Sequence, residues 1–398
     1  MNLTGAREIL GRMLDPMPVT QFLDENVSKR FIKLDGAASH FPRAVLGDTP
    51  EAVILDAFED LSGKITWHAD KPSGPAPAVL RRDSAAAFRE QIGAFHANLY
   101  TVRIPDVRPL TPQLDEFCRA LELIFQTEVA ATAFWSRGDG AAPVHHDDHD
   151  IIAIQLRGQK KWFVSADPPS LSNNWKHIPE GPPRMDREIP VEMKTGDLLY
   201  LPRGTTHRVE GIEDSVHVSI GFTPVTMRDA VIACIDHLSD IVKPLREMTD
   251  PHIAVQVQTG DFGKLGDRVR QSLALLAEYC RTDQFIADAM QRRSSRAIGE
   301  LKRLDAPKVV AGLTADTRLR HNRMAISHLS GNARLIDFAY PGGHRYIHRG
   351  AEAAVTFIAQ TPEFAIRDLP GNLDMAIRIA LVDELVTNGF LEVAGGAG

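Results

Sequence analysis

Cysteine is scarce in this chain of 398 residues: Cys118, Cys234 and Cys280 lie far apart, and no two of them form a CxxC pair. The sequence therefore excludes a disulfide framework and a thiolate zinc site. Long hydrophobic runs are also missing, since no stretch of about 18 apolar residues occurs. The segment MNLTGAREILGRML has neither a long apolar region nor a signal-cleavage site. We expect a cytoplasmic protein without a membrane-spanning segment.

An excess of positive charge is lacking as well. The formal net charge is −7, which argues against a general attraction to nucleic acid or acidic membranes. Locally, the region from Lys264 to Gly350 holds sixteen lysine and arginine residues against eight aspartate and glutamate residues. This region is either a solvated helical face or a surface for RNA or an acidic partner. The aromatic and basic interleaving of single-strand binders is absent, so we do not expect nucleic acid as a partner.

The pattern of the chain changes twice, which predicts an α+β protein of two or three domains. Short β-rich runs such as VAATAFW, DIIAIQL and SVHVSIGF fill residues 128–222, separated by turn residues, and predict a barrel or a double-sheet jelly roll. Before this run, the segment QLDEFCRALELIF places Leu114, Phe117, Leu121 and Ile124 on one stripe of a helix, which predicts a helix that faces the core. Helical periodicity returns after Thr226. We expect a cupin-type domain at 1–225 with helices framing its start, a helical segment at 226–315 and a further domain at 316–398.

The last region has its own pattern. The strand-like runs ARLIDFAY and HRYIHR flank a Pro-Gly-Gly turn, and helical patterns occupy AEAAVTFIAQT and MAIRIALVDELVTNGF. This combination is typical of a small winged-helix-like unit.

The densest polar cluster is HHDDHD at residues 145–150, just ahead of an apolar run. Side chains at positions i and i+2 of a β-strand face the same way, so an H-x-D pair on a strand can bind one metal ion. The cluster offers two such pairs, His145 with Asp147 and His146 with Asp148, and alternation does not choose between them. The four members outside the ligand pair are then solvated residues of the site's mouth or partners of the ligands.

A second motif lies at GDLLYLPRGTTH, residues 196–207. Its spacing, G-x5-P-x-G-x2-H, matches the second cupin motif through His207, although Gly211 stands where that motif often has asparagine. The turn residues predict that His207 enters the barrel from a neighbouring strand. One histidine from here and an H-x-D pair from the cluster make a two-histidine, one-carboxylate set, which binds Fe(II) and leaves coordination positions open.

The chain resembles the ribosomal-oxygenase branch of the JmjC enzymes in the segments APVHHDDHDII, GQKKW, GDLLYLPRGTTH and SVHVSIGF, and in the order of its parts. The resemblance implies that His145, Asp147 and His207 bind Fe(II). It also implies that a basic residue fifteen positions after the first ligand binds the far carboxylate of the co-substrate 2-oxoglutarate. That residue is Lys160 in this frame and Lys161 if His146 were the first ligand, and the family alignment favours Lys160.

The resemblance implies further site residues and partners. His217 lies ten residues after His207, near the metal-bound end of 2-oxoglutarate, and Ser219 follows on the same face of the strand. The family's tyrosine, twelve residues before the first ligand, is replaced by Ala133. The implied activity is hydroxylation of a side chain in a protein substrate of the ribosomal-protein type. The helices from about Arg228 to Glu300 are expected to pair two subunits into a homodimer.

Two other functions fit the same residues. One is a tailoring enzyme that hydroxylates a ribosomally made precursor peptide, and the other is a cupin-like sensor without catalysis that is tied to a regulator. Substrate choice is expected to depend on the loop from Asp167 to Arg187, with Asn173, Asn174 and Trp175 as candidate contacts.

Overall fold

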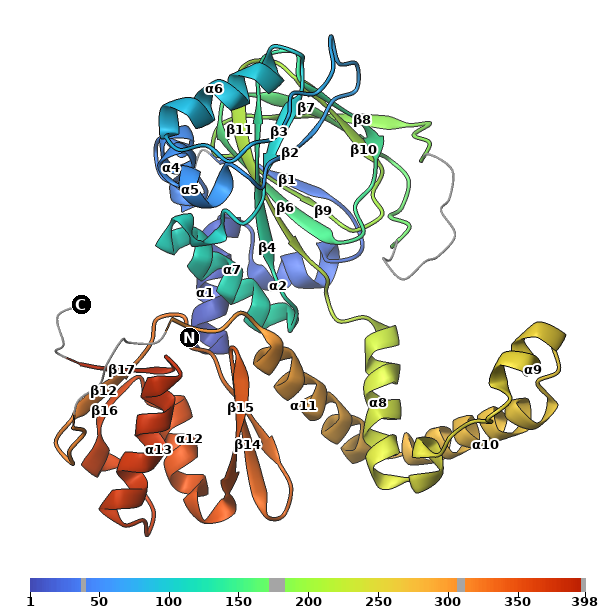
Figure 1. The fold of residues 1–398 in the computed structure, drawn as a ribbon, viewed down its shortest axis with the longest axis vertical. Helices are drawn as coiled ribbons and strands as arrows, with labels where there is room; N and C mark the ends of the chain where they lie inside the picture. Colours follow the sequence, from blue (N-terminus) through green and yellow to red (C-terminus); the bar gives the residue numbers. More distant parts are fainter. Residues whose placement is uncertain (37–40, 172–182, 306–311, 395–398) are drawn as a thin grey trace. The chain divides into compact units, whose positions relative to one another are not determined.

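The computed structural model of the chain describes residues 1–36, 41–171, 183–305 and 312–394 (Figure 1). These residues form two compact units, Met1–Pro224 and Val225–Gly398. The candidate substrate contacts Asn173, Asn174 and Trp175 lie outside the described residues. No helix among the described residues has the length and apolar character needed to cross a bilayer.

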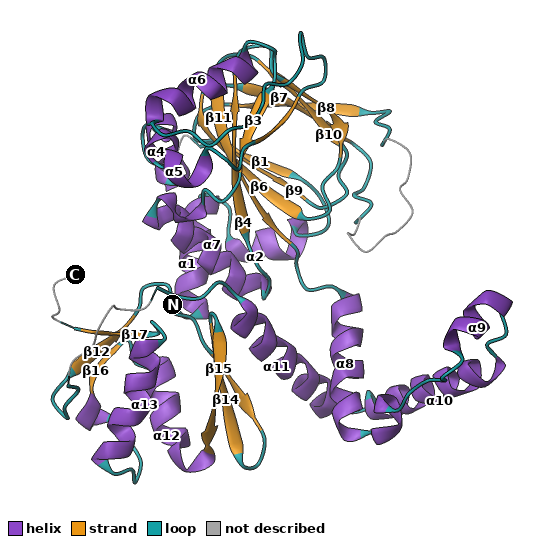
Figure 2. Ribbon diagram, viewed as in Figure 1, coloured by secondary structure: helices purple, strands orange, loops and turns teal. Residues whose placement is uncertain are grey.

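The first unit has helices that frame a set of strands (Figure 2). Its helices are α1 (Leu3–Leu14), α2 (Val19–Gln21), α3 (Phe41–Ala44), α4 (Pro50–Asp56), α5 (Phe58–Leu61), α6 (Ala85–His96) and α7 (Pro112–Phe125), with a π-helix at Phe22–Asn26 and a 3-10 turn at Arg108–Leu110. Its strands are β1 (Ile32–Leu34), β2 (Thr66–His68), β3 (Thr101–Ile104), β4 (Ala130–Ser136), β5 (Ala141–His145), β6 (Asp150–Arg157), β7 (Lys160–Ser165), β8 (Glu188–Met193), β9 (Leu198–Leu201), β10 (His207–Gly211) and β11 (Ser215–Phe222).

These strands make two antiparallel sheets, as the β-rich pattern of residues 128–222 predicts. The larger sheet has seven strands in the order β1-β9-β6-β11-β4-β3-β2, and the smaller has four in the order β5-β10-β7-β8. From β4 to β7, and again from β8 to β11, successive strands alternate between the sheets, so that β5 and β10 belong to one and β6 and β11 to the other. This arrangement is the cupin-type double-stranded β-helix.

Alternation along the strands of the larger sheet separates two environments. On β11, Val216, Val218 and Ile220 join the core cluster that includes residues of α1, α6 and α7. The intervening residues, His217 and Ser219 among them, line a cavity on the sheet's other face. Both faces of the sheet are therefore covered, which explains why seven of the eight residues of β6 are buried.

Helix α7 covers the outer face with the apolar stripe that its periodicity predicts. Thr111 caps the helix by accepting a hydrogen bond from the backbone N–H of Leu114, and Pro112 occupies the first turn, where no backbone donor is needed. Leu114, Phe117 and Leu121 are fully buried, whereas Ile124 is partly buried against the same core. Burial of this face anchors the larger sheet.

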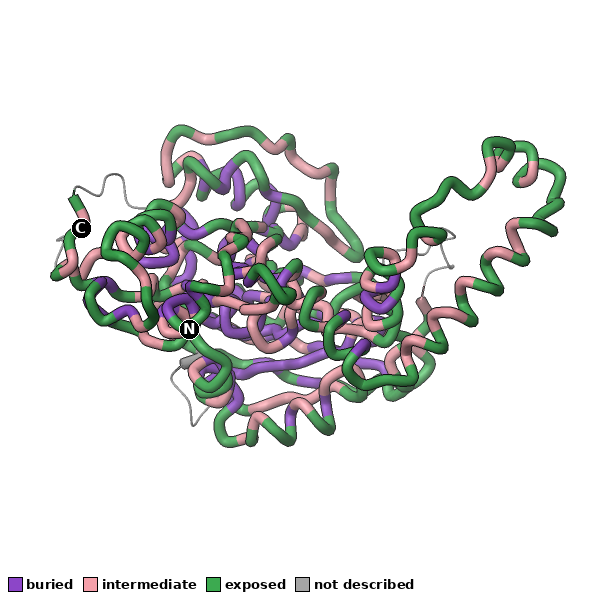
Figure 3. Tube along the Cα trace, turned by 90° about the horizontal axis from the view of Figure 1, so that it is seen from below, coloured by how far each residue is buried: buried purple, intermediate pink, exposed green. Residues whose placement is uncertain are grey.

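The second unit begins with four helices, α8 (Met227–Ile241), α9 (Ile253–Thr259), α10 (Gly263–Tyr279) and α11 (Asp283–Glu300), with a 3-10 turn at Lys243–Arg246. Helices α8 and α11 pack on each other through a small core that contains Ala233, Leu238 and Phe285. Helices α9 and α10 contain no buried residue, and Figure 3 shows them in the colours of intermediate and exposed positions. Several of their apolar side chains, including Val257, Val269 and Leu273, are exposed, whereas Leu275, Leu276 and Tyr279 of α10 pack partly against the small core.

The remainder of the second unit is mixed. It comprises β12 (Arg318–His321), β13 (His328–Gly331), β14 (Leu335–Tyr340), β15 (Gly343–His348), α12 (Glu352–Gln360), β16 (Glu363–Ala365), α13 (Met375–Thr387) and β17 (Leu391–Val393), with 3-10 turns at Arg349–Ala351 and Ile366–Asp368. The predicted strands around the Pro-Gly-Gly turn are β14 and β15, which pair with each other, and the two predicted helices are α12 and α13. The sequence pattern did not identify the short strands of the β16-β12-β17 sheet.

Candidate metal centre

A cavity of about 300 Å³ lies between the inner faces of the two sheets of the first unit. The larger sheet contributes alternate residues of β3, β4 and β11, and the smaller sheet contributes residues of β5, β7 and β10. The lining residues that bear on the chemistry are His68, Phe134, His145, Asp147, Lys160, Trp162, His207, His217 and Ser219. All six residues that the sequence singles out for metal or co-substrate binding therefore line one cavity.

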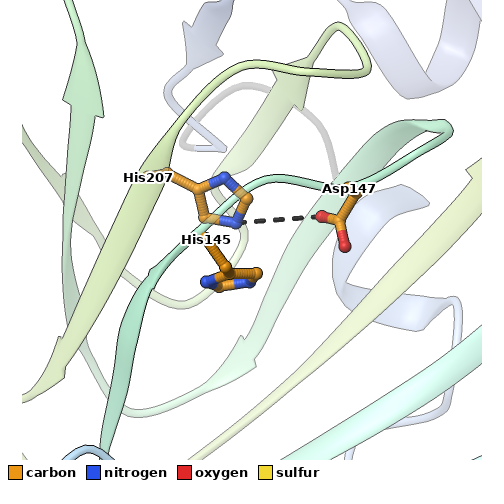
Figure 4. A group of neighbouring side chains, drawn as sticks. All are labelled: His145, Asp147 and His207. Atoms are coloured by element: carbon orange, nitrogen blue, oxygen red, sulfur yellow. Dashed lines mark ion pairs between the residues drawn. The ribbon is translucent and has the colours of Figure 1, made fainter. Parts of the chain in front are cut away.

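Three of these side chains converge. His145 ends β5, Asp147 follows in the turn, and His207 begins β10 directly opposite His145 in the strand pairing. One ligand atom of each residue lies within 4.8 Å of the others, and His207 Nε2 is 3.8 Å from an Asp147 carboxylate oxygen (Figure 4). Such a set of two imidazoles and one carboxylate has the composition that binds a divalent transition metal on one side.

Hydrogen bonds determine the tautomer of both imidazole rings. Nδ1–H of His145 donates to the carbonyl oxygen of Pro143 at 2.8 Å, and Nδ1–H of His207 donates to that of Thr205 at 2.9 Å. Each ring is thus held as the tautomer whose Nε2 carries a free lone pair. Burial and the nearby His145 lower the pKa of His207 to about 4, so this ring is neutral at pH 7 and can donate that lone pair.

The turn before His207 makes hydrogen bonds to Asp147 and Asp150 of the HHDDHD segment. The backbone N–H of Gly204 donates to the carbonyl oxygen of Asp147 at 2.8 Å, and the backbone N–H of Arg203 donates to the carboxylate of Asp150 at 3.1 Å. Asp150 is fully buried and also accepts a hydrogen bond from the hydroxyl of Tyr200. Gly204 has a φ of +74°, which favours glycine at this turn. Asp150 is therefore a buried anchor of the turn and not a solvated residue of the mouth.

The choice between the two H-x-D pairs follows from the cavity. His146 and Asp148 do not line it, whereas His145 and Asp147 do. Strand alternation is not the reason, because β5 ends at His145 and Asp147 lies in the turn that follows. The expectation that both ligands lie on one strand is wrong; the turn aims Asp147 back toward His145. His149, the next but one, also lines the cavity and is exposed, which agrees with a place at its mouth.

The cavity also distinguishes the two lysines of β7, Lys160 and Lys161. Lys160 is 2% exposed and lines the cavity, whereas Lys161 is half-buried and lies 5.2 Å from the Phe163 ring. Lys160 Nζ is 3.0 Å from Nδ1 of His217, and no described carboxylate pairs with this ammonium group. Burial lowers the pKa of Lys160 to about 7. An unpaired, buried ammonium group of this kind is prepared for an anionic ligand.

His217 is fixed from two sides. Its ring stacks on Phe134 with 4.7 Å between centroids and 2° between planes, and Trp162 meets it edge-on at 5.5 Å. Burial and the charge of Lys160 hold the pKa of His217 well below its usual range, so the ring stays neutral. Ser219 lines the cavity two residues further along β11.

Ala133, which stands at the position expected for the family's tyrosine, does not line the cavity. Ala133 is buried in the helix-covered core and faces away from the cavity, because alternate residues of β4 point to opposite sides. Phe134 and Thr132 are the β4 side chains that line the cavity at this level. The family's tyrosine therefore has no counterpart at Ala133 in the folded chain.

Three cavity residues that bear on the chemistry were missed by sequence reasoning. One is Arg103 of β3, an exposed residue whose guanidinium carbon lies 5.4 Å from the centre of the Phe134 ring. His68 comes from β2, in a segment (ITWHAD) without a motif, and only the pairing of β2 with β3 and of β3 with β4 brings it to the cavity. Trp162 was expected to be a core aromatic; it does pack in the core, but it also lines the cavity and stacks on His207 at 5.5 Å. Its indole N–H has no hydrogen-bond partner among the described residues.

Comparison with known proteins agrees with this geometry. Residues 108–230 match the family described as the JmjC domain. Ribosomal oxygenase 2 of Rattus norvegicus is 29% identical over 154 residues, which is 37% of this chain and 32% of that protein. The bifunctional lysine-specific demethylase and histidyl-hydroxylase NO66 of Drosophila sechellia is 25% identical over 216 residues, which is 52% of this chain and 31% of that protein. The matched region spans about a third of the length of these two relatives.

A solved structure shares the fold over a longer span. The ribosomal oxygenase YcfD of Escherichia coli, in complex with cobalt and 2-oxoglutarate, superposes with a TM-score of 0.58 over 96% of this chain and 99% of that one, at 17% identity. This likeness in fold extends through the second unit, most of which lies beyond the JmjC match. Residues 108–230 thus match the JmjC domain on a cupin-type fold, and the relatives that share this sequence similarity include ribosomal oxygenase 2 and NO66.

Proposed function

We propose that this protein is an Fe(II)- and 2-oxoglutarate-dependent oxygenase that hydroxylates a side chain of a protein substrate of the ribosomal-protein type. The observation that carries the proposal is the convergence of His145, Asp147 and His207 in the same cavity as the buried, unpaired ammonium group of Lys160. A metal site alone fits many binding proteins. A metal site next to a buried cation that has no carboxylate partner is typical of a protein that also binds an acidic co-substrate.

The donor set fits ferrous iron. Two Nε2 lone pairs and one carboxylate are hard to intermediate ligands, and they come from one wall of the cavity, so that positions on the open side stay free for other ligands. Bound there, iron supplies the activation of dioxygen, which no side chain of this protein can supply. The protein's own residues orient the ligands. The carbonyl groups of Pro143 and Thr205 fix the rings of His145 and His207. Asp150 fixes the turn that leads into β10 by accepting a hydrogen bond from the backbone N–H of Arg203.

The same cavity fits 2-oxoglutarate, an acid with two carboxylates. Lys160 is the proposed partner of the carboxylate that lies away from the metal, and His217 and Ser219 are proposed to contact the co-substrate along β11. Apolar and aromatic side chains such as Phe134, Trp162 and Val209 exclude water around it, which strengthens these polar contacts.

The protein substrate is inferred from the relatives, since ribosomal oxygenase and histidyl-hydroxylase are their names. The test is to incubate the purified protein with Fe(II), 2-oxoglutarate, ascorbate and isolated ribosomal proteins, and to measure intact masses. We expect one ribosomal protein to gain the mass of one oxygen atom only when 2-oxoglutarate is present. Formation of succinate without any modified ribosomal protein would leave the oxygenase chemistry standing and would refute this substrate class.

The second unit is proposed to form the dimer and to contact partner proteins. Exposed apolar side chains on α8, α9 and α10, including Val231, Ile235, Val257, Val269 and Leu273, favour burial against a second copy of the chain. We infer a homodimer formed by residues 226–315 and a winged-helix-like domain at residues 316–398 that contacts partners other than nucleic acid. Light scattering at low micromolar concentration should give about twice the 43.9 kDa of one chain. The three free cysteines agree with a reducing compartment such as the cytoplasm.

A further inference from the structure

His68 brings a second histidine of the larger sheet to the part of the cavity that holds Lys160. It ends β2 and pairs with Thr101 of β3, and its ring lies 5.9 Å from that of Phe134, on which His217 stacks. Burial, and after it the charges of Lys160, Arg103 and His145, lower the pKa of His68 to about 3. His68 is therefore a neutral imidazole that offers one N–H donor near Lys160 and His217.

The surroundings of Lys160 are rich in donors. Lys160 donates one of its three hydrogens to Nδ1 of His217, which leaves two hydrogens free and fixes His217 as the tautomer that carries its proton on Nε2. The indole N–H of Trp162, a residue that is 3% exposed, has no acceptor among the described residues. Trp162 lines the same cavity and contacts His217 edge-on. A buried donor without an acceptor points to a ligand oxygen that is bound there.

Acceptors are few on the same walls. Among the described residues that line the cavity, Asp147 is the one acidic side chain, and it belongs to the metal trio. The donors of Lys160, His68, His217 and Trp162 thus face a space with no internal counter-charge apart from that carboxylate. A carboxylate group has acceptor sites for several of these donors at once.

We propose that His68 is a specificity-determining residue of the co-substrate site, which donates a hydrogen bond to the far carboxylate of 2-oxoglutarate beside Lys160. The inference rests on the proposed function. It assigns part of the site to the N-terminal segment that frames the barrel, outside residues 108–230 that match the JmjC domain. His68 thereby supplies a neutral donor at a level where β4 offers Phe134, which has none.

The test compares two ligands that share one end. Both 2-oxoglutarate and pyruvate carry a 2-oxo acid that can chelate a metal, and only 2-oxoglutarate has a second carboxylate. Calorimetric titration of the Mn(II)-loaded full-length protein measures binding without turnover. We expect His68→Phe, which keeps an aromatic ring and removes the donor, to bind 2-oxoglutarate about tenfold more weakly. Its affinities for pyruvate and for Mn(II) alone should equal those of the wild type.

The controls separate the possible failures. His68→Asn restores an N–H donor and should recover part of the affinity, and His252→Phe, which changes an exposed histidine of the second unit, should leave all three affinities unchanged. Unchanged affinity of His68→Phe for 2-oxoglutarate would overturn the assignment. So would an equal loss for both acids, because His68 would then act on the metal end or on the fold. A wild-type protein that binds Mn(II) but neither acid would instead refute the proposed function.

Discussion

The two ends of the cavity are built in different ways. The metal trio comes from two neighbouring strands of the smaller sheet and the turn that follows β5, and Asp150 anchors the turn that leads into His207. The group around Lys160 draws on three strands that are distant in the sequence, β2, β7 and β11, from both sheets. Trp162 contacts both groups through His207 and His217. A ligand motif can therefore be local in the sequence, whereas a site for a carboxylate depends on how whole strands are paired.

The largest effect is expected at the metal end. Asp147→Ala removes the only acidic ligand and should abolish succinate formation from 2-oxoglutarate, with at least about a 100-fold loss of Mn(II) affinity. Asp148→Ala, one residue further along the chain and outside the cavity lining, should keep both. Succinate production and Mn(II) titration measure the two effects. Equal succinate formation by Asp147→Ala and the wild type would end the assignment of the trio.

The next largest effect is expected at the co-substrate end of the cavity, where Lys160 can be compared with Lys161. Lys160→Met removes the buried ammonium group and should weaken 2-oxoglutarate binding by about 100-fold, because one partner of a buried ion pair is lost. Lys161→Met changes a half-buried residue that does not line the cavity and should bind normally. Isothermal titration of the Mn(II)-loaded variants measures both. A larger loss for Lys161→Met would transfer the metal ligands to His146 and Asp148.

The affinity for 2-oxoglutarate is expected to depend on pH through Lys160. With its pKa lowered to about 7, Lys160 is largely charged below this pH and loses its proton above it. A carboxylate binds the charged form, so 2-oxoglutarate affinity should be highest near or below pH 7 and fall about tenfold between about pH 7 and about pH 8.5. His68 and His217 stay neutral throughout this range, because their pKa values lie well below it. Constant affinity over this range would contradict the role of Lys160.

The smallest effect is expected at the anchor of the turn. Asp150→Asn preserves the shape of the side chain but removes the charge that accepts hydrogen bonds from the Tyr200 hydroxyl and the Arg203 N–H. Mn(II) affinity should fall about tenfold, in the range typical of residues that orient metal ligands, and 2-oxoglutarate binding at saturating Mn(II) should hardly change. A loss of 2-oxoglutarate binding alone would mean that the two ends of the cavity are not separable in this way.

Much of the fold follows from local patterns. The β-rich run, the stripe of α7 and the strand pair around the Pro-Gly-Gly turn all appear as their periodicity predicts, because burial of one face imposes a fixed period on each element. The β16-β12-β17 sheet escaped because strands of three and four residues carry too few positions for a pattern. Asp147 was placed on a strand for a related reason, since nothing in HHDDHD marks where β5 ends.

The motif spacings along the chain fix which residues can form the metal trio and which lysines can meet an acid. Strand pairing in the folded protein places Lys160, Phe134 and His68 on the cavity, whereas Lys161 and Ala133 do not line it. A shift of one residue in register turns every side chain of a strand to the opposite face, and that register is set by contacts between segments far apart in the sequence.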